Sequence, residues 1–368
     1  MGCARPARSR RCSHDGARRR REARVTARNR WLFSPAIDTA TFGGTALIAL
    51  LLVLVAPRGG ESPEWTWITG VLLVDVAHVW STTFVVYLDP VELRRRPALY
   101  AGTPILCFAA ALALYAAGEG VFWRAIAYLA VFHFIRQQYG WVMLYRARNG
   151  ERGGRLLDGA TIYLATLYPL VWWHAHLPRP FAWMKDGDFV AGLPHWLATA
   201  TGIAYAGVLA AYVIRALGQR PVSWGKHLVV ATTAACWYVG IVVTSSDYAF
   251  TVTNVFVHGI PYMVLVFLYA RAASREAPAG LGARMLGGRV ARGVIVFLGT
   301  LWLVAYAEEL LWDRAFWHDR AWLFGHGFDV GGAALILAPL LATPQLTHYV
   351  LDGFLWRRTQ NPRLGQLL

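Results

Sequence analysis

The chain of 368 residues is 56% hydrophobic and only 15% charged, and its mean hydropathy is +0.38. Soluble domains carry about 25% charged residues, so the composition excludes an ordinary soluble enzyme and predicts an integral membrane protein. The formal charge is nevertheless +15, from 36 Lys and Arg against 21 Asp and Glu. Such an excess can reflect an acidic partner or the orientation of the chain in a membrane, and the positions of the basic residues decide between these.

Residues 1–38 form a basic arm with eleven arginines, and its first 30 residues or so lack apolar periodicity. No short apolar core with a small-residue cleavage site follows directly, so we do not expect a cleavable signal peptide. We expect a disordered cytoplasmic arm that lies on anionic lipid headgroups. Nucleic-acid binding is the alternative, but aromatic residues are not interleaved with the arginines, so we predict no nucleic-acid partner.

Ten mostly apolar stretches follow, each close to the ~20 residues that a membrane-spanning helix needs. Strict strand alternation is absent, so the predicted fold class is an all-α, polytopic transmembrane helix bundle. Residues 39–357 form its membrane domain and 358–368 a short cytoplasmic tail. Pro339 and Pro344 predict a kink or a break in the last stretch. The expected spans are 39–57, 64–88, 98–117, 121–145, 156–177, 193–217, 224–244, 248–270, 291–311 and 328–356.

The basic residues are distributed very unevenly between the two sides of this bundle. The arm, the tail and every second connection hold 29 of the 36, the opposite connections hold six, and Arg136 lies inside a span. Cytoplasmic connections carry an excess of Lys and Arg, so we expect both termini in the cytoplasm and a bacterial inner-membrane location. Tryptophans cluster at the opposite ends of the spans, as in an interfacial aromatic belt.

Four histidines lie deep in spans that all run in the same direction. Each is 9–13 residues from the charged residue that ends its span, or roughly 14–20 Å at the ~1.5 Å rise of a helix. They therefore share one layer in the membrane, where a polar side chain is a candidate functional residue. These are His78, His133, His258 and His348.

Each deep histidine has a polar companion three or four residues away, on the same helix face. Imidazole nitrogens and carboxylate oxygens without a thiolate favour a metal ion, with iron preferred over zinc. We predict the four histidines as ligands, with Asp75 and Asp352 as further ligands or as acceptors that orient the imidazoles. Gln137 and Asn254 are expected in the surrounding shell.

Three further residues near the deep histidines are candidate catalytic residues. Arg136 could hold a carboxylate or phosphate headgroup, or balance an aspartate. Tyr139 and Tyr349 follow deep histidines and could donate hydrogen bonds.

In architecture the chain resembles the histidine-rich integral-membrane metalloenzymes, which include membrane desaturases, hydroxylases and bacterial β-carotene dioxygenases. The segments that carry deep histidines, FHFIRQQYGW (132–141) and HYVLDGFLWR (348–357), have the character of family motifs. The HxxxH and HxxHH clusters of the desaturases are absent, so a full di-iron site is not expected. The resemblance implies a metal-dependent oxidation of a lipid or isoprenoid by O2, with an electron donor as a partner.

Two other functions fit parts of the sequence. In a haem-binding electron carrier, histidines would serve as axial ligands, but two stacked haems would place them in two layers. A transporter for protons or ions suits ten helices with a polar cluster at mid-membrane, but histidines confined to spans of one direction do not suit inverted repeats. The chain has no GxGxxG motif and no P-loop, so we expect no nucleotide-binding domain.

Overall fold

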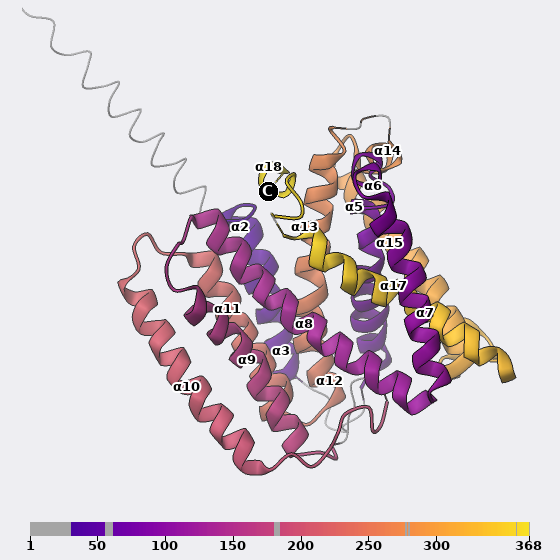
Figure 1. Cartoon of the computed structure of the whole chain (residues 1–368), viewed down its shortest axis with the longest axis horizontal. Helices are drawn as coiled ribbons and strands as arrows, with labels where there is room; N and C mark the ends of the chain where they lie inside the picture. Colours follow the sequence, from indigo (N-terminus) through magenta and orange to yellow (C-terminus); the bar gives the residue numbers. More distant parts are fainter. Residues whose placement is uncertain are drawn as a thin grey trace, which may run out of the picture.

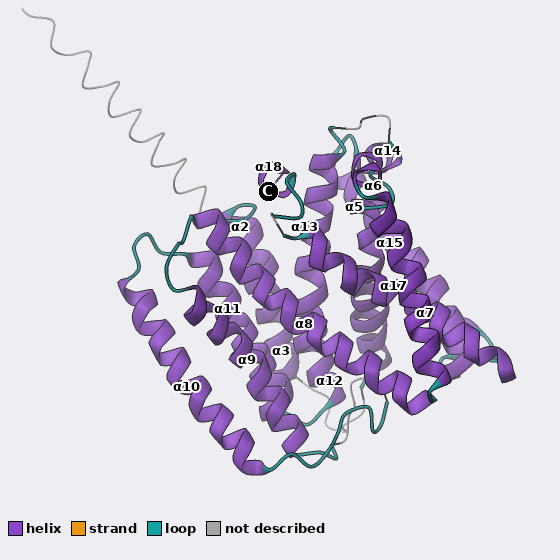
Figure 2. Ribbon diagram, viewed as in Figure 1, coloured by secondary structure: helices purple, strands orange, loops and turns teal. Residues whose placement is uncertain are grey.

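A computed structural model of the chain describes residues 31–55, 62–179, 185–276, 278, 280–357 and 359–367. Every regular element in these ranges is a helix (Figure 2), which confirms the all-α class. Most of the basic arm, up to Arg30, lies outside the described residues.

A helical segment occupies each of the ten predicted spans, and eight of these segments are long and apolar enough to cross a membrane. The two outside that set are α8 and α9, which carry the buried charges Arg146 and Asp158. The bounds are α2 Pro35–Asp38, η1 Thr39–Gly44 and α3 Thr45–Leu54; α4 Glu64–Thr66, η2 Trp67–Val76 and α5 Ala77–Val85; α6 Pro90–Arg95; α7 Pro97–Ala116; α8 Glu119–Asn149; α9 Arg155–Ala175; α10 His195–Gly218; α11 Trp224–Trp237 and η3 Tyr238–Val243; α12 Asp247–Phe250, η4 Thr251–Val255 and α13 Phe256–Ala273; α14 Leu281–Leu286; α15 Val290–Trp312 and η5 Asp313–Trp317; α16 Ala321–Phe324; η6 Gly331–Ala333 and α17 Ala334–Leu355; and α18 Leu364–Leu367.

The last long helix, α17, runs uninterrupted through both Pro339 and Pro344, where the sequence predicted a kink or a break. The predicted break does not occur. Thr343 Oγ1 donates a hydrogen bond of 2.8 Å to the Pro339 carbonyl within the helix, and α17 packs closely against α7. Membrane helices tolerate proline where side-chain hydroxyls and neighbouring helices supply such support.

The long helix α8 crosses the bundle between two groups of helices (Figure 1). On one side α9 packs against α10 and α11, and on the other α17 packs against α7, and α5 packs against α13 and α15. Elements α2, α6, α14 and α18 gather at one end of the bundle. We call this the basic end, since it holds Arg95, Arg146 and Arg363, and we call the other the opposite end.

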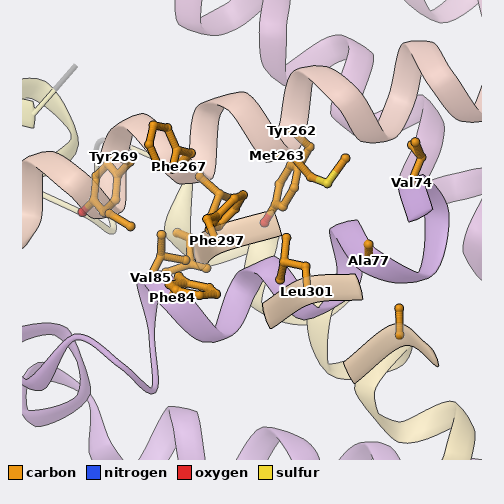
Figure 3. Packing of buried hydrophobic residues seen from close by; sticks show 14 of the residues in the cluster. Val74, Ala77, Phe84, Val85, Tyr262, Met263, Phe267, Tyr269, Phe297 and Leu301 are labelled. Carbon is orange, nitrogen blue, oxygen red and sulfur yellow. The ribbon is translucent and has the colours of Figure 1, made fainter. Parts of the chain in front are cut away.

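Aromatic packing joins α5, α13 and α15 (Figure 3). The ring of Phe297 lies 4.9 Å from that of Phe84 and 5.5 Å from that of Phe267, centroid to centroid. Close-packed rings of this kind keep neighbouring helices at fixed positions. This core therefore gives α5 and α13, which each carry a deep histidine, a rigid mutual placement.

A buried group of charges ties the basic ends of α8, α9, α10 and α11 together. We call Arg146, Glu151, Asp158, Arg215 and Lys226 the charge cluster. Asp158 accepts hydrogen bonds from Arg146, from Lys226 at 3.2 Å and from Arg215 at 3.0 Å. Lys226 also donates to Glu151 at 2.5 Å. The side chains of Arg146, Asp158 and Lys226 are almost fully buried. Their pairing with one another offsets the cost of removing these charges from water.

The predicted tail, 358–368, folds back onto the basic end in the part that is described. Arg363 donates to Asp89 at 2.9 Å and to Glu276 at 3.0 Å. Asn361 donates to the hydroxyl of Tyr269 at 3.0 Å. The segment is therefore held against two connections, the one that follows α5 and the one that follows α13.

Candidate metal centre

The four deep histidines meet inside the bundle, although they come from four separate helices. His78 lies on α5, His133 on α8, His258 on α13 and His348 on α17, and none exposes more than 5% of its surface. In five of the six pairs, all but His258 with His348, the ring centroids are 4.7 to 6.4 Å apart. The four helices thus converge on one buried imidazole cluster.

Three of these histidines present ligand nitrogens at metal-binding separations. One nitrogen each of His78, His133 and His348 lies within 4.8 Å of the others. His348 Nε2 is 3.1 Å from His133 Nε2, and His258 Nε2 is 3.1 Å from His78 Nε2. Metal–nitrogen bonds of about 2.0–2.1 Å put two ligands of one tetrahedral ion about 3.3 Å apart. The cluster can therefore hold a metal ion, with His258 adjoining the group of three.

Two carboxylates flank the imidazoles, as the helical spacing predicted. Asp75 Oδ1 lies 3.5 Å from His78 Nδ1, three residues along the same helical segment. Asp352 Oδ1 lies 3.8 Å from His348 Nδ1, and its Oδ2 lies 4.0 Å from His133 Nε2. Asp352 therefore reaches two imidazoles from different helices, whereas Asp75 reaches one.

A hydrogen-bond network fixes Asp352 and His348. Tyr262 and Trp356 both donate to Asp352 Oδ1, the indole at 3.2 Å. Thr82 Oγ1 lies 2.8 Å from His348 Nδ1 and 3.3 Å from the Tyr262 hydroxyl. In the tautomer in which His348 Nδ1–H donates to Thr82 Oγ1, the lone pair of His348 Nε2 is free for a metal.

The close crossing of two helical segments explains how His78 and His258 come into contact. A Cβ atom on Gly259 would lie 2.6 Å from Val74 Cγ1 and 3.3 Å from the Val74 carbonyl oxygen. Only glycine permits this approach. Both histidines also follow π-helical segments, η2 and η4, whose wider turns shift the side-chain phase and occur often at functional sites.

The predicted catalytic residues fall in two places. Tyr349 stacks on His133, with ring centroids 4.3 Å apart, so it borders the cluster. Arg136 donates to the hydroxyl of Tyr163 on α9, and its guanidinium lies 4.9 Å from the ring of Tyr139. The structure therefore places Arg136 and Tyr139 together at the α8–α9 interface.

The two predicted amide companions differ from the carboxylates. Asn254 donates to the Phe250 carbonyl at 3.2 Å and to Thr253 at 3.1 Å, while its Oδ1 has no hydrogen-bond partner among the described residues. In the same part of the chain, neither polar atom of the Gln137 side chain has a hydrogen-bond partner. No hydrogen bond between either amide and a histidine is present among these described contacts.

Sequence reasoning missed Thr82 and Trp356 as parts of this site. Each lies four residues after a predicted site residue, His78 and Asp352 respectively, so the helical spacing could have identified them. The predicted companions are charged, amide or tyrosine side chains. A hydroxyl and an indole N–H are equally able to hold a buried polar group.

No known protein family matches the chain, and no curated protein or solved structure is significantly similar to it. The metal centre therefore stands on its own geometry.

Proposed function

We propose that the protein is an integral-membrane metalloenzyme that uses iron at the histidine cluster to oxidise a lipid or isoprenoid with O2. The observation that carries the proposal is the set of three buried histidine nitrogens within 4.8 Å of one another. Buried imidazoles at this separation have little reason to cluster unless a cation joins them, because each would otherwise lose hydrogen bonds with water.

The chemistry of the donor set supports iron over the other metals. His133, His348 and Asp352 supply two imidazoles and a carboxylate, the combination typical of non-haem iron oxygenases. His78 is the third nitrogen ligand, and Asp75 Oδ1 lies 3.5 Å from its Nδ1 as a nearby negative charge. Cys107 and Cys236, the free cysteines of the described residues, do not belong to the group of side chains that converge closely enough to hold a metal, so a thiolate-bound metal is not supported.

The membrane setting supports a hydrophobic substrate. Eight helices of the described residues are long and apolar enough to cross a membrane, so an acyl chain or isoprenoid can approach the bundle from the lipid without crossing water. A dioxygenase places both O2 atoms in its products and needs no external electrons. A desaturase or hydroxylase needs two electrons and two protons from a donor and releases water, so that activity requires an electron-donor partner. We further propose that the basic end faces the cytoplasm of a bacterial cell.

Haem is the less favoured cofactor. The imidazole pairs touch at 3.1 Å between nitrogens, and a porphyrin ring between them would require the helices to separate. A transporter with a metal or proton site is the remaining alternative, and it differs from the enzyme in a measurable way, because it moves its ligand across a bilayer and consumes no O2.

Metal analysis of the protein purified in detergent tests the proposal. We expect about one iron per chain, with its loss in His133→Ala and its retention in His195→Ala, whose histidine is exposed at the start of α10. O2 consumption should then depend on an added isoprenoid or acyl lipid. Absence of stoichiometric metal, or equal metal content in both variants, rules out the metal centre. Bound metal without O2 consumption, together with flux into liposomes, would instead indicate a transporter.

A further inference from the structure

One face of α8 is turned away from the centre of the bundle and carries Arg136. Leu129 and Phe132, on the two preceding turns of this face, expose 42% and 61% of their surface, and Gly140, on the following turn, is half-buried. In a membrane protein such an exposed apolar face meets lipid. Arg136 is itself half-buried and lies ten residues, or about 15 Å, before Arg146 at the basic end. A guanidinium is therefore placed inside the span and beside the lipid.

The charge of Arg136 has no counter-ion among the described residues. Its guanidinium donates to the hydroxyl of Tyr163 on α9 and lies 4.9 Å from the centroid of the Tyr139 ring, and neither of these groups is a carboxylate. Arg146, on the same helix, is by contrast paired with Asp158. A charged side chain within a membrane span is ordinarily paired or turned toward water. The unpaired guanidinium of Arg136 therefore favours an anion from outside the chain.

Two tyrosines and a second arginine continue the site toward the basic end. The rings of Tyr139 and Tyr163 stack, with their centroids 5.1 Å apart. The Tyr163 hydroxyl accepts a hydrogen bond from Arg136, so its own proton is available to a further acceptor. Arg155, exposed at the start of α9, has its Nη2 3.5 Å from the Tyr139 hydroxyl. An anion beside Arg136 would thus meet a hydroxyl donor, with a second cation on the side of the aqueous surface.

The neighbouring Gln137 gives an independent indication of a ligand. Both polar atoms of its amide are buried and have no hydrogen-bond partner in the described part of the chain. Such atoms are rare in folded proteins, because each one loses its hydrogen bonds with water. Gln137 lies one helical turn after His133, so the unpaired amide adjoins both Arg136 and the turn that carries this histidine. Gly140 adds room, since a Cβ atom there would meet nothing within 4 Å.

We propose that Arg136 binds the carboxylate or phosphate headgroup of an anionic lipid, whose acyl or isoprenoid chain packs along Leu129 and Phe132. The inference rests on the proposed function and narrows its substrate class from lipids in general to anionic ones. A guanidinium binds either anion through paired N–H donors, and Gln137 has an unpaired N–H group for a further oxygen. Arg136 is three residues, or about 4.5 Å along the helix, from His133. A lipid held there lies next to the turn of α8 that carries a histidine of the cluster.

Binding of radiolabelled lipids to the protein in detergent tests the site. Oleate, oleyl phosphate and oleyl alcohol share one chain and differ only in the headgroup. We expect Arg136→Gln to weaken binding of an anionic lipid about tenfold, the loss for one charge-assisted contact, and to leave binding of the alcohol unchanged. Arg136→Lys keeps the charge and should keep most of the affinity. Arg124→Gln is the matched control, since Arg124 lies at the other end of α8, where it donates to the Gly187 carbonyl at 3.0 Å.

The two headgroups separate the sources of the anion. Arg136-dependent binding of oleate identifies a fatty acid, and such binding of oleyl phosphate alone identifies a phosphorylated lipid. Wild-type affinity of Arg136→Gln for both anions, an equal loss for oleyl alcohol, or an equal loss in Arg124→Gln would overturn the site. The measurement needs neither metal nor O2, so it is independent of the proposed metal centre. Arg136-dependent binding by a wild type that holds no iron would support the lipid site and overturn only the metalloenzyme.

Discussion

The charge cluster at the basic end and the histidine cluster within the bundle both bury polar side chains where several helices meet, but they satisfy them differently. In the charge cluster, Asp158 receives three cationic donors and Lys226 bridges two carboxylates. In the histidine cluster, the Nδ1 atoms of His78 and His258 have no hydrogen-bond partner among the described residues. Glu151 Oε1 is also a buried atom without a hydrogen-bond partner in the described part of the chain, but each charged side chain of the charge cluster faces an opposite charge. The imidazoles are ligands that can still give a lone pair to a metal ion. The first cluster is therefore structural and the second is suited to binding.

The largest expected effect follows from breaking the paired cluster. Asp158→Asn removes the charge that Arg146, Arg215 and Lys226 share, and leaves buried cations without their partner. Loss of one member of a buried ion pair destabilises a protein by about 3–5 kcal/mol. Thermal unfolding in detergent should show this loss, with the metal content of the protein that remains folded unchanged.

The control for this prediction is Glu119→Gln at the other end of α8. Its ion pair with Lys185, at 2.8 Å, is largely exposed, and exposed pairs contribute about 0–1 kcal/mol. Similar unfolding temperatures for Asp158→Asn and Glu119→Gln would mean that the charge cluster does not hold the four helices together.

Metal removal comes next in size and addresses the unpaired cluster. A ligand that binds only the folded state stabilises it by about 2.7 kcal/mol at 100 times its dissociation constant. Chelation should therefore lower the unfolding temperature of the wild type but leave His133→Ala unchanged. His195→Ala, the matched control, should respond to chelation like the wild type. An identical response of His133→Ala and the wild type would contradict a metal at this cluster.

The helix crossing that brings His78 to His258 offers a third test. Gly259→Ala adds a methyl group that meets Val74, and such overpacking destabilises cores by about 1–3 kcal/mol. Because the added methyl separates η2 from α13, metal affinity should fall together with stability. Gly299→Ala on α15 is the control, since its Cβ would meet nothing within 4 Å; it should leave metal affinity at the wild-type value.

Helical spacing predicted much of this site, and the limits of the prediction have physical causes. The deep layer of His78, His133, His258 and His348 could be read from distances along each helix, because a helix has a fixed rise per residue. The helix faces that meet are set by how the helices cross. The close approach of η2 to α13 at Gly259 leaves no periodic pattern in the sequence. The position of Arg136 also required the fold, because a residue three after His133 can face α9 as readily as the cluster.

The same limits explain the differences in the fold. Apolar runs predicted where the ten helical segments would lie, and eight of these are long and apolar enough to cross a membrane. They did not predict the π-helical segments η2 and η4, whose extra residue per turn depends on packing against neighbours. The continuity of α17 through two prolines likewise depends on its contact with α7, which no local pattern in 334–355 records.

The smallest expected effect is a dependence on pH of the stability that the charge cluster contributes. Burial alone would raise the pKa of the Glu151 carboxyl, but the hydrogen bond and charge of Lys226, together with Ser223 and Arg146, hold that pKa below its ordinary value. A carboxyl with a depressed pKa in the folded state adds stability above its unfolded pKa of about 4.3, and this stability is lost as the pH falls through the folded pKa. Wild type should therefore exceed Glu151→Gln in stability by up to about 1 kcal/mol at pH 7, and the difference should vanish below pH ~4. Unfolding of both proteins by denaturant at several pH values measures it. A difference that stays constant down to the lowest pH would show that Glu151 acts by shape and not by charge, and the charge cluster would then depend on Asp158 alone.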